Sequence, residues 1–141
     1  MRKIVIATHG DFAQGLANTI KMFVGETADI RTICAFTKEE DPLKAFKEIM
    51  SELSADDEIL VFTDIKGGSV NQYVNQFRIE NPEYIHFHLI SGVNMPLILE
   101  LITSAPDEYL SEELILEKIG ICKNEIIYMN TYTPDLSDID D

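Results

Sequence analysis

The sequence is poor in positive charge. It has 11 lysine and arginine residues against 25 aspartate and glutamate residues, which gives a formal net charge of −14 over 141 residues. A nucleic-acid-binding domain needs basic side chains to neutralise phosphates, so this balance excludes nucleic acid as a partner. The same acidity favours solubility and encounter with a basic protein surface.

Long hydrophobic runs are also missing. No apolar run approaches the roughly 20 residues of a membrane-spanning helix. The first apolar run, 4–7, is far too short for the core of a signal peptide. We therefore expect a cytoplasmic protein, and a chain of this length predicts one domain with one good core.

Cysteines and nucleotide-binding motifs are scarce or absent. Cys34 and Cys122 are the two cysteines, and they lack the spacing of a metal or redox motif. We predict that both are reduced core residues. The sequence contains neither a Walker A loop nor a Gly-x-Gly-x-x-Gly fingerprint, which argues against nucleotide binding. We expect no cofactor and no metal.

What is present is a regular alternation of strand and helix patterns. Apolar runs predict strands over 4–7, 30–36, 58–63 and 84–90, and helical spacing predicts helices over 12–24, 42–53, 70–77 and 97–102 and after Ser111. Such a succession predicts an α/β fold with a doubly wound, mainly parallel sheet and helices on both faces. Five aromatic residues fall in these periods and are predicted to lie in the core: Phe36, Phe46, Phe62, Phe77 and Phe87.

The local signals for turns and helix ends agree with this pattern. Gly10 suits a tight turn after the first strand, and Asp11 is a good N-cap for the helix over 12–24, which ends at Gly25. Asp41 and Pro42 form a cap and first-turn proline for the second helix. A last apolar run, 125–129, indicates a further strand. Residues 130–141 hold four aspartates and no basic residue, so a disordered tail is expected.

Three turns leave the carboxyl ends of the predicted strands. They contain His9, residues 64–69 and residues 92–96. Carboxyl ends of parallel strands share one edge of the sheet, where open α/β folds bind ligands. If the first and third strands are neighbours, His9 and the 64–69 turn flank one crevice. The alternative for His9 is a hydrogen-bonded histidine that closes a turn.

The residue types at this edge fit phosphoryl transfer to a histidine. Asp64 can hold the proton on one nitrogen of the His9 ring, as the aspartate of a hydrolase triad does. Gly67, Gly68 and Ser69, at a helix start, offer backbone N–H groups and a hydroxyl to a phosphate. The alternative interpretation of Asp64 is a residue that caps a turn. Glycines before a helix are often present only because the turn requires them. A kinase lysine motif is missing, so the donor is expected to be a phosphorylated protein.

Three segments together resemble a known family. These are 4–10 with its Thr-His-Gly, 62–69 (FTDIKGGS) and 92–97 (GVNMPL), and they resemble the signatures of the mannose-type enzyme IIA (type-4 EIIA domain) of the bacterial phosphotransferase system (PTS). The resemblance covers about residues 1–130 and leaves 131–141 as an acidic tail.

The resemblance implies a phosphocarrier. His9 would accept a phosphoryl group from phospho-HPr through Nε2 and pass it to a histidine of the IIB component, which phosphorylates sugar entering through IIC and IID. Asp64 would bind Nδ1–H of His9, and Ser69 would contact the phosphoryl group. The family also implies a homodimer in which a C-terminal strand, here 125–129, crosses antiparallel to the partner's sheet.

The sequence departs from the family's commonest pattern beside the loop. Val70-Asn71-Gln72 stands where Pro-Phe-Asn is usual, and Lys66 stands where an apolar residue is frequent. Two other functions stay open: the phosphocarrier subunit of a PTS-dependent dihydroxyacetone kinase, and a non-catalytic module that binds an anion or regulates another protein.

His86 and His88 form a separate candidate. Alternation places them on one face of the fourth predicted strand, which raises a metal site. No third ligand is evident, so packing under a helix is the favoured interpretation.

Overall fold

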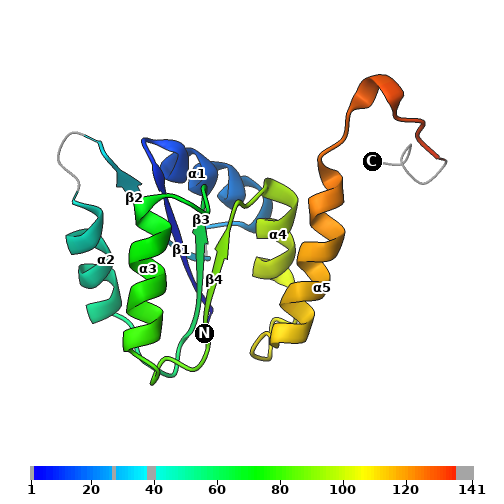
Figure 1. Cartoon of the computed structure of the whole chain (residues 1–141). Helices are drawn as coiled ribbons and strands as arrows, with labels where there is room; N and C mark the ends of the chain where they lie inside the picture. Colours follow the sequence, from blue (N-terminus) through cyan, green and yellow to red (C-terminus); the bar gives the residue numbers. More distant parts are fainter. Residues whose placement is uncertain (1, 27, 38–40, 136–141) are drawn as a thin grey trace.

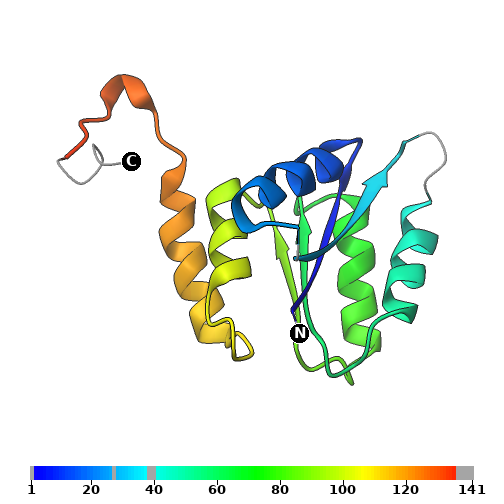
Figure 2. The same cartoon turned by 180° about the vertical axis from the view of Figure 1, so that it is seen from behind.

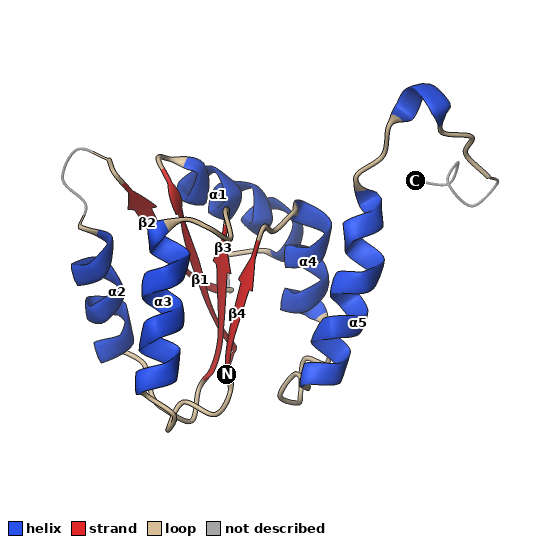
Figure 3. Ribbon diagram, in the orientation of Figure 1, coloured by secondary structure: helices blue, strands red, loops and turns tan. Residues whose placement is uncertain are grey.

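A parallel sheet forms the centre of the molecule. The computed structural model describes residues 2–26, 28–37 and 41–135. Its strands are β1 (Arg2–His9), β2 (Asp29–Ala35), β3 (Glu58–Thr63) and β4 (Phe87–Ser91). They lie in the order β2-β1-β3-β4, and every pairing is parallel. All arrows in Figure 3 therefore point toward one edge of the sheet, as the sequence predicts.

Helices cover both faces of this sheet, which confirms the doubly wound α/β prediction. They are α1 (Phe12–Val24), α2 (Pro42–Ser51), α3 (Ser69–Glu80), α4 (Met95–Thr103) and α5 (Glu112–Cys122). Helices α2 and α3 lie on one face, while α1 and α4 lie on the other with α5 packed beside α4 (Figures 1 and 2). None of these helices, within the described ranges, is long and apolar enough to cross a membrane.

The central position of β1 between two layers of helices explains why its sequence is a continuous apolar run. Ile4 and Ile6 pack toward α1 and α4, whereas Val5 and Ala7 pack toward α2 and α3. A strand covered on both faces has no face in solvent, so polar and apolar residues do not alternate along it. Strand β3 is likewise buried along its whole length, so the central strands hold the carboxyl-edge loops on a rigid base.

One predicted strand boundary is wrong, and two apolar residues of α1 lie outside its buried face. The fourth strand begins at Phe87 instead of Tyr84, because backbone hydrogen bonds from Tyr84 to Asn81 and from Ile85 to Glu83 form turns there. The buried face of α1 consists of Ala13, Leu16, Ala17 and Ile20. Phe12 and Phe23 stand at helical spacing from Leu16 and Ile20 in the sequence, but both are exposed.

The caps follow the predictions with one exception. Asp41 and Ser111 accept hydrogen bonds from the backbone N–H groups of Leu43 and Leu114, respectively. Asp11 occupies the N-cap position of α1 but makes no capping hydrogen bond. The buried hydroxyl of Thr8 instead accepts from the backbone N–H of Ala13 at 2.7 Å, so β1 itself supplies the cap.

The predicted core aromatics include one error. Phe46, Phe62 and Phe87 are buried, and Phe77 is packed against Phe46 and Phe87 at the edge of the core, but 66% of Phe36 is exposed. Phe36 directly follows β2 and has a φ of +62°, so the chain turns away from the sheet at this residue. The two cysteines are free thiols, Cys122 buried and Cys34 partly exposed.

The predicted strand over 125–129 is absent from this chain. After α5 the chain forms two short 3₁₀ turns, η1 (Lys123–Glu125) and η2 (Met129–Thr131), and projects away from the body in Figure 1. None of the described strands lies beside this segment, so its backbone makes no strand pairing with them. The predicted tail begins within the described residues, but its residues 136–141 lie outside them.

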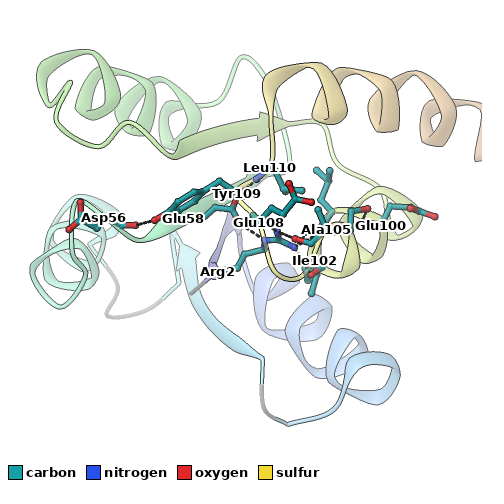
Figure 4. A network of polar contacts seen from close by, with 11 residues as sticks. Arg2, Asp56, Glu58, Glu100, Ile102, Ala105, Glu108, Tyr109 and Leu110 are labelled. Atoms are coloured by element: carbon teal, nitrogen blue, oxygen red, sulfur yellow. Dashed lines mark hydrogen bonds and ion pairs between the residues drawn. The ribbon is translucent and has the colours of Figure 1, made fainter.

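A network of hydrogen bonds closes the amino-terminal end of the sheet (Figure 4). Arg2 pairs with the buried carboxylate of Glu58, which also accepts from the backbone N–H of Leu110. The Arg2 guanidinium donates to carbonyls of the last turn of α4 and of the α4–α5 connection: those of Leu101, Ile102, Ser104, Ala105 and Glu108. These contacts tie β1 and β3 to that connection.

The two histidines of the fourth strand region pack differently from each other. The His86 ring stacks on Tyr109 with 3.5 Å between ring centroids. His88 lies on β4, partly buried. The described ranges contain no group of three or more His, Cys, Asp or Glu residues placed to hold a metal ion.

Candidate functional site

His9 and Asp64 meet at the carboxyl edge of the sheet, as the sequence predicts. Strands β1 and β3 are neighbours with Ala7 opposite Thr63 in the register. His9 ends β1, and Asp64 directly follows β3. Pairing of the two central strands therefore brings together residues that are 55 positions apart.

The Asp64 carboxylate binds His9 at two points. Its oxygens lie 3.0 and 3.2 Å from Nδ1 of the imidazole, and one of them accepts the backbone N–H of His9 at 2.9 Å. A carboxylate can only accept, so the proton of the neutral ring belongs on Nδ1. Nε2 then carries the lone pair, on a side chain that remains 36% exposed.

The charge of Asp64 is stabilised by this contact. Burial acts to raise the pKa of the Asp64 carboxyl, but the hydrogen bonds from the backbone and the ring of His9 outweigh burial. The pKa of Asp64 therefore lies below its ordinary value. The carboxylate stays ionised at neutral pH and can stabilise positive charge that develops on the imidazole.

Gly68 lies against the other edge of the His9 ring. A Cβ added at Gly68 would meet Cε1 of His9 at 2.9 Å and Nε2 at 3.5 Å, whereas one added at Gly67 would meet nothing within 4 Å. The backbone N–H of Gly68 donates to the carbonyl of Ile65 at 3.2 Å. That N–H is therefore engaged in the turn, and the glycine's visible role is to leave room for the imidazole.

Ser69 begins α3 directly after this glycine. The first-turn N–H groups of any α helix have no partner within the helix, and the positive end of its dipole points in the same direction. The hydroxyl of Ser69 and the amides of the first turn of α3 are thus the donors that this loop offers to an anion.

Asn71 holds the loop in place, and the sequence pattern did not reveal this role. Its Oδ1 accepts from the hydroxyl of Thr63 at 2.9 Å, and its Nδ2 donates to the carbonyl of Lys66 at 3.0 Å. The side chain therefore joins the end of β3 to the middle of the 64–69 loop. The departure from the usual Pro-Phe-Asn supplies a brace for the loop.

Phe36 is the second residue at the site that the sequence pattern misassigned. Its ring is stacked on the His9 imidazole, with 5.3 Å between ring centroids and 19° between ring planes. Its place at the end of an apolar strand made it look like a core residue. The only sequence signal for the contact is that β2 ends at the same edge as β1.

The third turn supports the site without contributing reactive groups. Gly92 and Val93 donate backbone N–H groups to the carbonyl of Thr63. Asn94 caps α4 through the N–H of Leu97 and donates its amide to the carbonyl of Cys122. The turn therefore fixes the end of β3 and anchors α5.

Known proteins are similar to this chain in both sequence and fold. The family model described as the PTS system fructose IIA component matches residues 3–119. A Klebsiella pneumoniae protein assigned to the phosphoenolpyruvate-dependent sugar PTS has a solved structure with 37% identity, 92% coverage of each chain and a TM-score of 0.78. The PTS IIA protein associated with the fucose utilization operon of Streptococcus pneumoniae gives 30% identity, a TM-score of 0.73 and coverage of 92% of this chain and 93% of that one.

Curated relatives extend the comparison. The mannose-specific EIIAB component of Escherichia coli K12 is 27% identical over 79% of this chain, and this chain spans about a third, 34%, of its length. The fructose-specific EIIA component of Bacillus subtilis 168 is 25% identical over 73% of this chain and 70% of its own. With the family model matching most of the described sheet and helices, the chain belongs to the mannose-type IIA family of the sugar phosphotransferase system.

Proposed function

We propose that this chain accepts a phosphoryl group from phospho-HPr on Nε2 of His9 and passes it to the IIB component during sugar uptake. The observation that carries the proposal is the contact of Asp64 with Nδ1 of His9 at 3.0 Å. It leaves Nε2 as the free nucleophilic nitrogen, at the edge where parallel sheets bind ligands.

The transfer is a simple exchange of nitrogen–phosphorus bonds. The lone pair of Nε2 attacks phosphorus, and the bond from phosphorus to the donor histidine breaks, returning its electron pair to the donor ring. The proton on Nδ1 stays hydrogen-bonded to Asp64. The first-turn amides of α3 and the Ser69 hydroxyl offer hydrogen bonds to the phosphoryl oxygens. Transfer to IIB repeats the exchange with His9 as the donor.

The surroundings of His9 suit a protein partner. Phe12, Phe36 and Ile65 are large apolar residues that are exposed beside the reacting edge. Exposed apolar residues around a site are typical of protein docking surfaces. The net charge of −14 favours a partner with a basic face. The E. coli relative is named as an EIIAB component, which supports IIB as the acceptor.

The proposal is tested by mixing the protein with phosphoenolpyruvate, enzyme I and HPr. We expect an acid-labile mass increase of one phosphoryl group, located on His9 by fragmentation. His9→Gln, which keeps a polar side chain of similar reach, should take up none. Labelling of the His9→Gln variant, or of another residue in the natural chain, would contradict the proposal.

We also propose a homodimer in which the 125–129 segment joins the partner's sheet, with membrane association only through IIC and IID. Strand β4 pairs on one side with β3, and no other described strand covers its outer edge. His88 Nε2 and Ser91 Oγ, both on β4, are buried without a hydrogen-bond partner in the described chain. Ile126, Tyr128 and Met129 are exposed apolar residues.

Light scattering on the full chain tests the assembly. The natural protein should have the mass of a dimer, and Ile126→Asp should shift it toward the monomer, because a charge is costly at a buried interface. A monomeric natural protein would overturn the proposed exchange and leave the phosphocarrier role standing.

A further inference from the structure

Phe36 combines two features that the fold alone does not require. Its φ of +62° lies in the left-handed region, which bulky side chains rarely adopt, and 66% of the residue is exposed. Residues in such conformations persist where the surrounding structure holds them, and they cluster at functional sites. Here the hydroxyl of Thr37 donates to the carbonyl of Cys34, and Gly10 donates its N–H to the carbonyl of Ala35. The turn after β2 is thereby tied to the turn after His9.

The conformation brings the Phe36 ring against the His9 imidazole. The planes are nearly parallel, at 19°, and the 5.3 Å centroid distance is that of an offset stack. The other sides of the same imidazole are occupied by Asp64 at Nδ1 and by Gly68 near Cε1. Three residues from two different loops, the turn after β2 and the 64–69 loop, therefore contact one ring.

We propose that Phe36 is a positioning residue for His9: its ring fixes the plane of the imidazole so that Nε2 faces an incoming phosphoryl group. The carboxylate of Asp64 fixes one point of the ring but leaves rotation about that hydrogen bond. A flat contact on the ring face removes this freedom. The part of the inference that concerns phosphoryl transfer rests on the proposed function.

The chain offers well-matched variants. Phe36→Gly removes the ring and places glycine where φ is positive, so the backbone loses no stability through strain. Phe36→Tyr keeps the ring. Ala105→Gly is the backbone control, because Ala105 has a φ of +44° at the opposite end of the sheet. Phe23→Ala is the side-chain control, since Phe23 is an exposed phenylalanine on the last turn of α1.

Two measurements separate positioning from folding and docking. The first is the proton NMR spectrum of the His9 ring without phosphate, in which the stacked Phe36 ring should displace the imidazole signals. The second is the rate of His9 phosphorylation by phosphoramidate, a small donor that needs no docking surface. We expect Phe36→Gly to lose the displacement and to react at least about tenfold more slowly, since small misplacements of a reacting group have such effects.

The melting temperature of Phe36→Gly should stay within about 3 °C of the natural protein, because the exposed ring contributes little to the core. Phe36→Tyr and both controls should react at the natural rate. An unchanged phosphoramidate rate in Phe36→Gly overturns the proposal, as does a defect seen only as a raised KM for phospho-HPr, which would make Phe36 a docking residue. If the natural protein takes no phosphoryl group, the proposed function fails, and the NMR comparison still decides whether Phe36 orders His9.

Discussion

The two ends of β1 and β3 carry similar polar groups in opposite settings. At the amino ends, Arg2 and Glu58 are largely buried, and the guanidinium and carboxylate form hydrogen bonds to each other, to the last turn of α4 and to the α4–α5 connection. At the carboxyl ends, His9 and Asp64 also pair, but the imidazole is partly exposed, and the Asp64 carboxylate binds only its Nδ1 side. The amino end is built for stability, and the carboxyl end leaves the imidazole that we propose to react partly exposed.

This contrast has a physical basis in the direction of the strands. All four strands are parallel, so the two edges of the sheet are chemically different along their whole length. Helix N-termini gather at the carboxyl edge and favour anions there. Helix N-termini do not provide this favourable potential for anions at the amino edge, so a charge buried at that edge must be neutralised by a partner.

The largest effect is expected from a substitution at the amino end of the sheet, and it is a loss of stability. Arg2→Leu leaves the Glu58 carboxylate buried without its partner and several carbonyls without a donor. Removing one member of a buried pair lowers the free energy of unfolding by about 3–5 kcal/mol. Urea unfolding measures this loss. Arg31→Leu is the matched control, because its partners Glu52 and Asp29 are exposed and partly exposed, respectively, and such surface pairs contribute less than about 1 kcal/mol each. Equal losses in the two variants would refute the structural role of the Arg2 network.

The second-largest effect is expected at the carboxyl end of the sheet, where a substitution should slow phosphorylation without unfolding the protein. Asp64→Asn removes the charge that orients and stabilises the His9 ring. We expect phosphorylation by phospho-HPr to slow by about a hundredfold, equivalent to about 2.7 kcal/mol of activation free energy. Quenched-flow labelling measures the rate, and circular dichroism should show an unchanged fold. A natural rate in Asp64→Asn would remove Asp64 from the mechanism.

The third effect compares the two neighbouring glycines of the 64–69 loop. Gly68→Ala places a methyl group 2.9 Å from Cε1 of His9, although the φ of −74° accommodates alanine. The imidazole must shift, and we expect transfer to slow by about tenfold. Gly67→Ala is the neighbouring control, because its methyl group would meet nothing within 4 Å. If the two variants transfer at the same rate, close packing of Gly68 against His9 has no part in the reaction.

The smallest effect concerns pH and lies on β4, between the two ends. Burial lowers the pKa of His88, while the charges of Glu58 and Glu112 oppose this and that of His86 adds to it. The unfolded chain therefore binds a proton at His88 at a pH where the folded chain does not. Stability should fall as pH drops below about 6.5 toward the folded pKa, by less than about 1 kcal/mol because water screens a partly exposed ring.

Melting curves between neutral and mildly acidic pH measure this dependence. His88→Gln, which keeps a polar side chain that does not titrate in this range, should flatten it. The lowered pKa of Asp64 acts in a lower window, because that contribution is lost only as pH falls through the folded pKa of a carboxyl group. A pH dependence that survives His88→Gln would assign it to other groups.

Much of the architecture could be predicted from local patterns. The apolar runs around Ile4 and Val61 identified β1 and β3, and the Asp41-Pro42 pair marked the start of α2. These signals act over a few residues, because capping and side-chain periodicity depend on neighbours in the chain. The prediction that His9 and Asp64 share an edge followed from strand direction and needed only that β1 and β3 be adjacent.

The sequence by itself determined the order of strands and helices, the edge that carries His9 and Asp64, and most of the caps. The tertiary structure alone decided that Thr8 caps α1, that Asn71 braces the loop, that Phe36 stacks on His9, and that 125–129 forms no strand in a single chain. The physical reason is range. Local preferences act along a few residues of backbone, whereas these contacts exist only after distant strands have paired and brought their ends together.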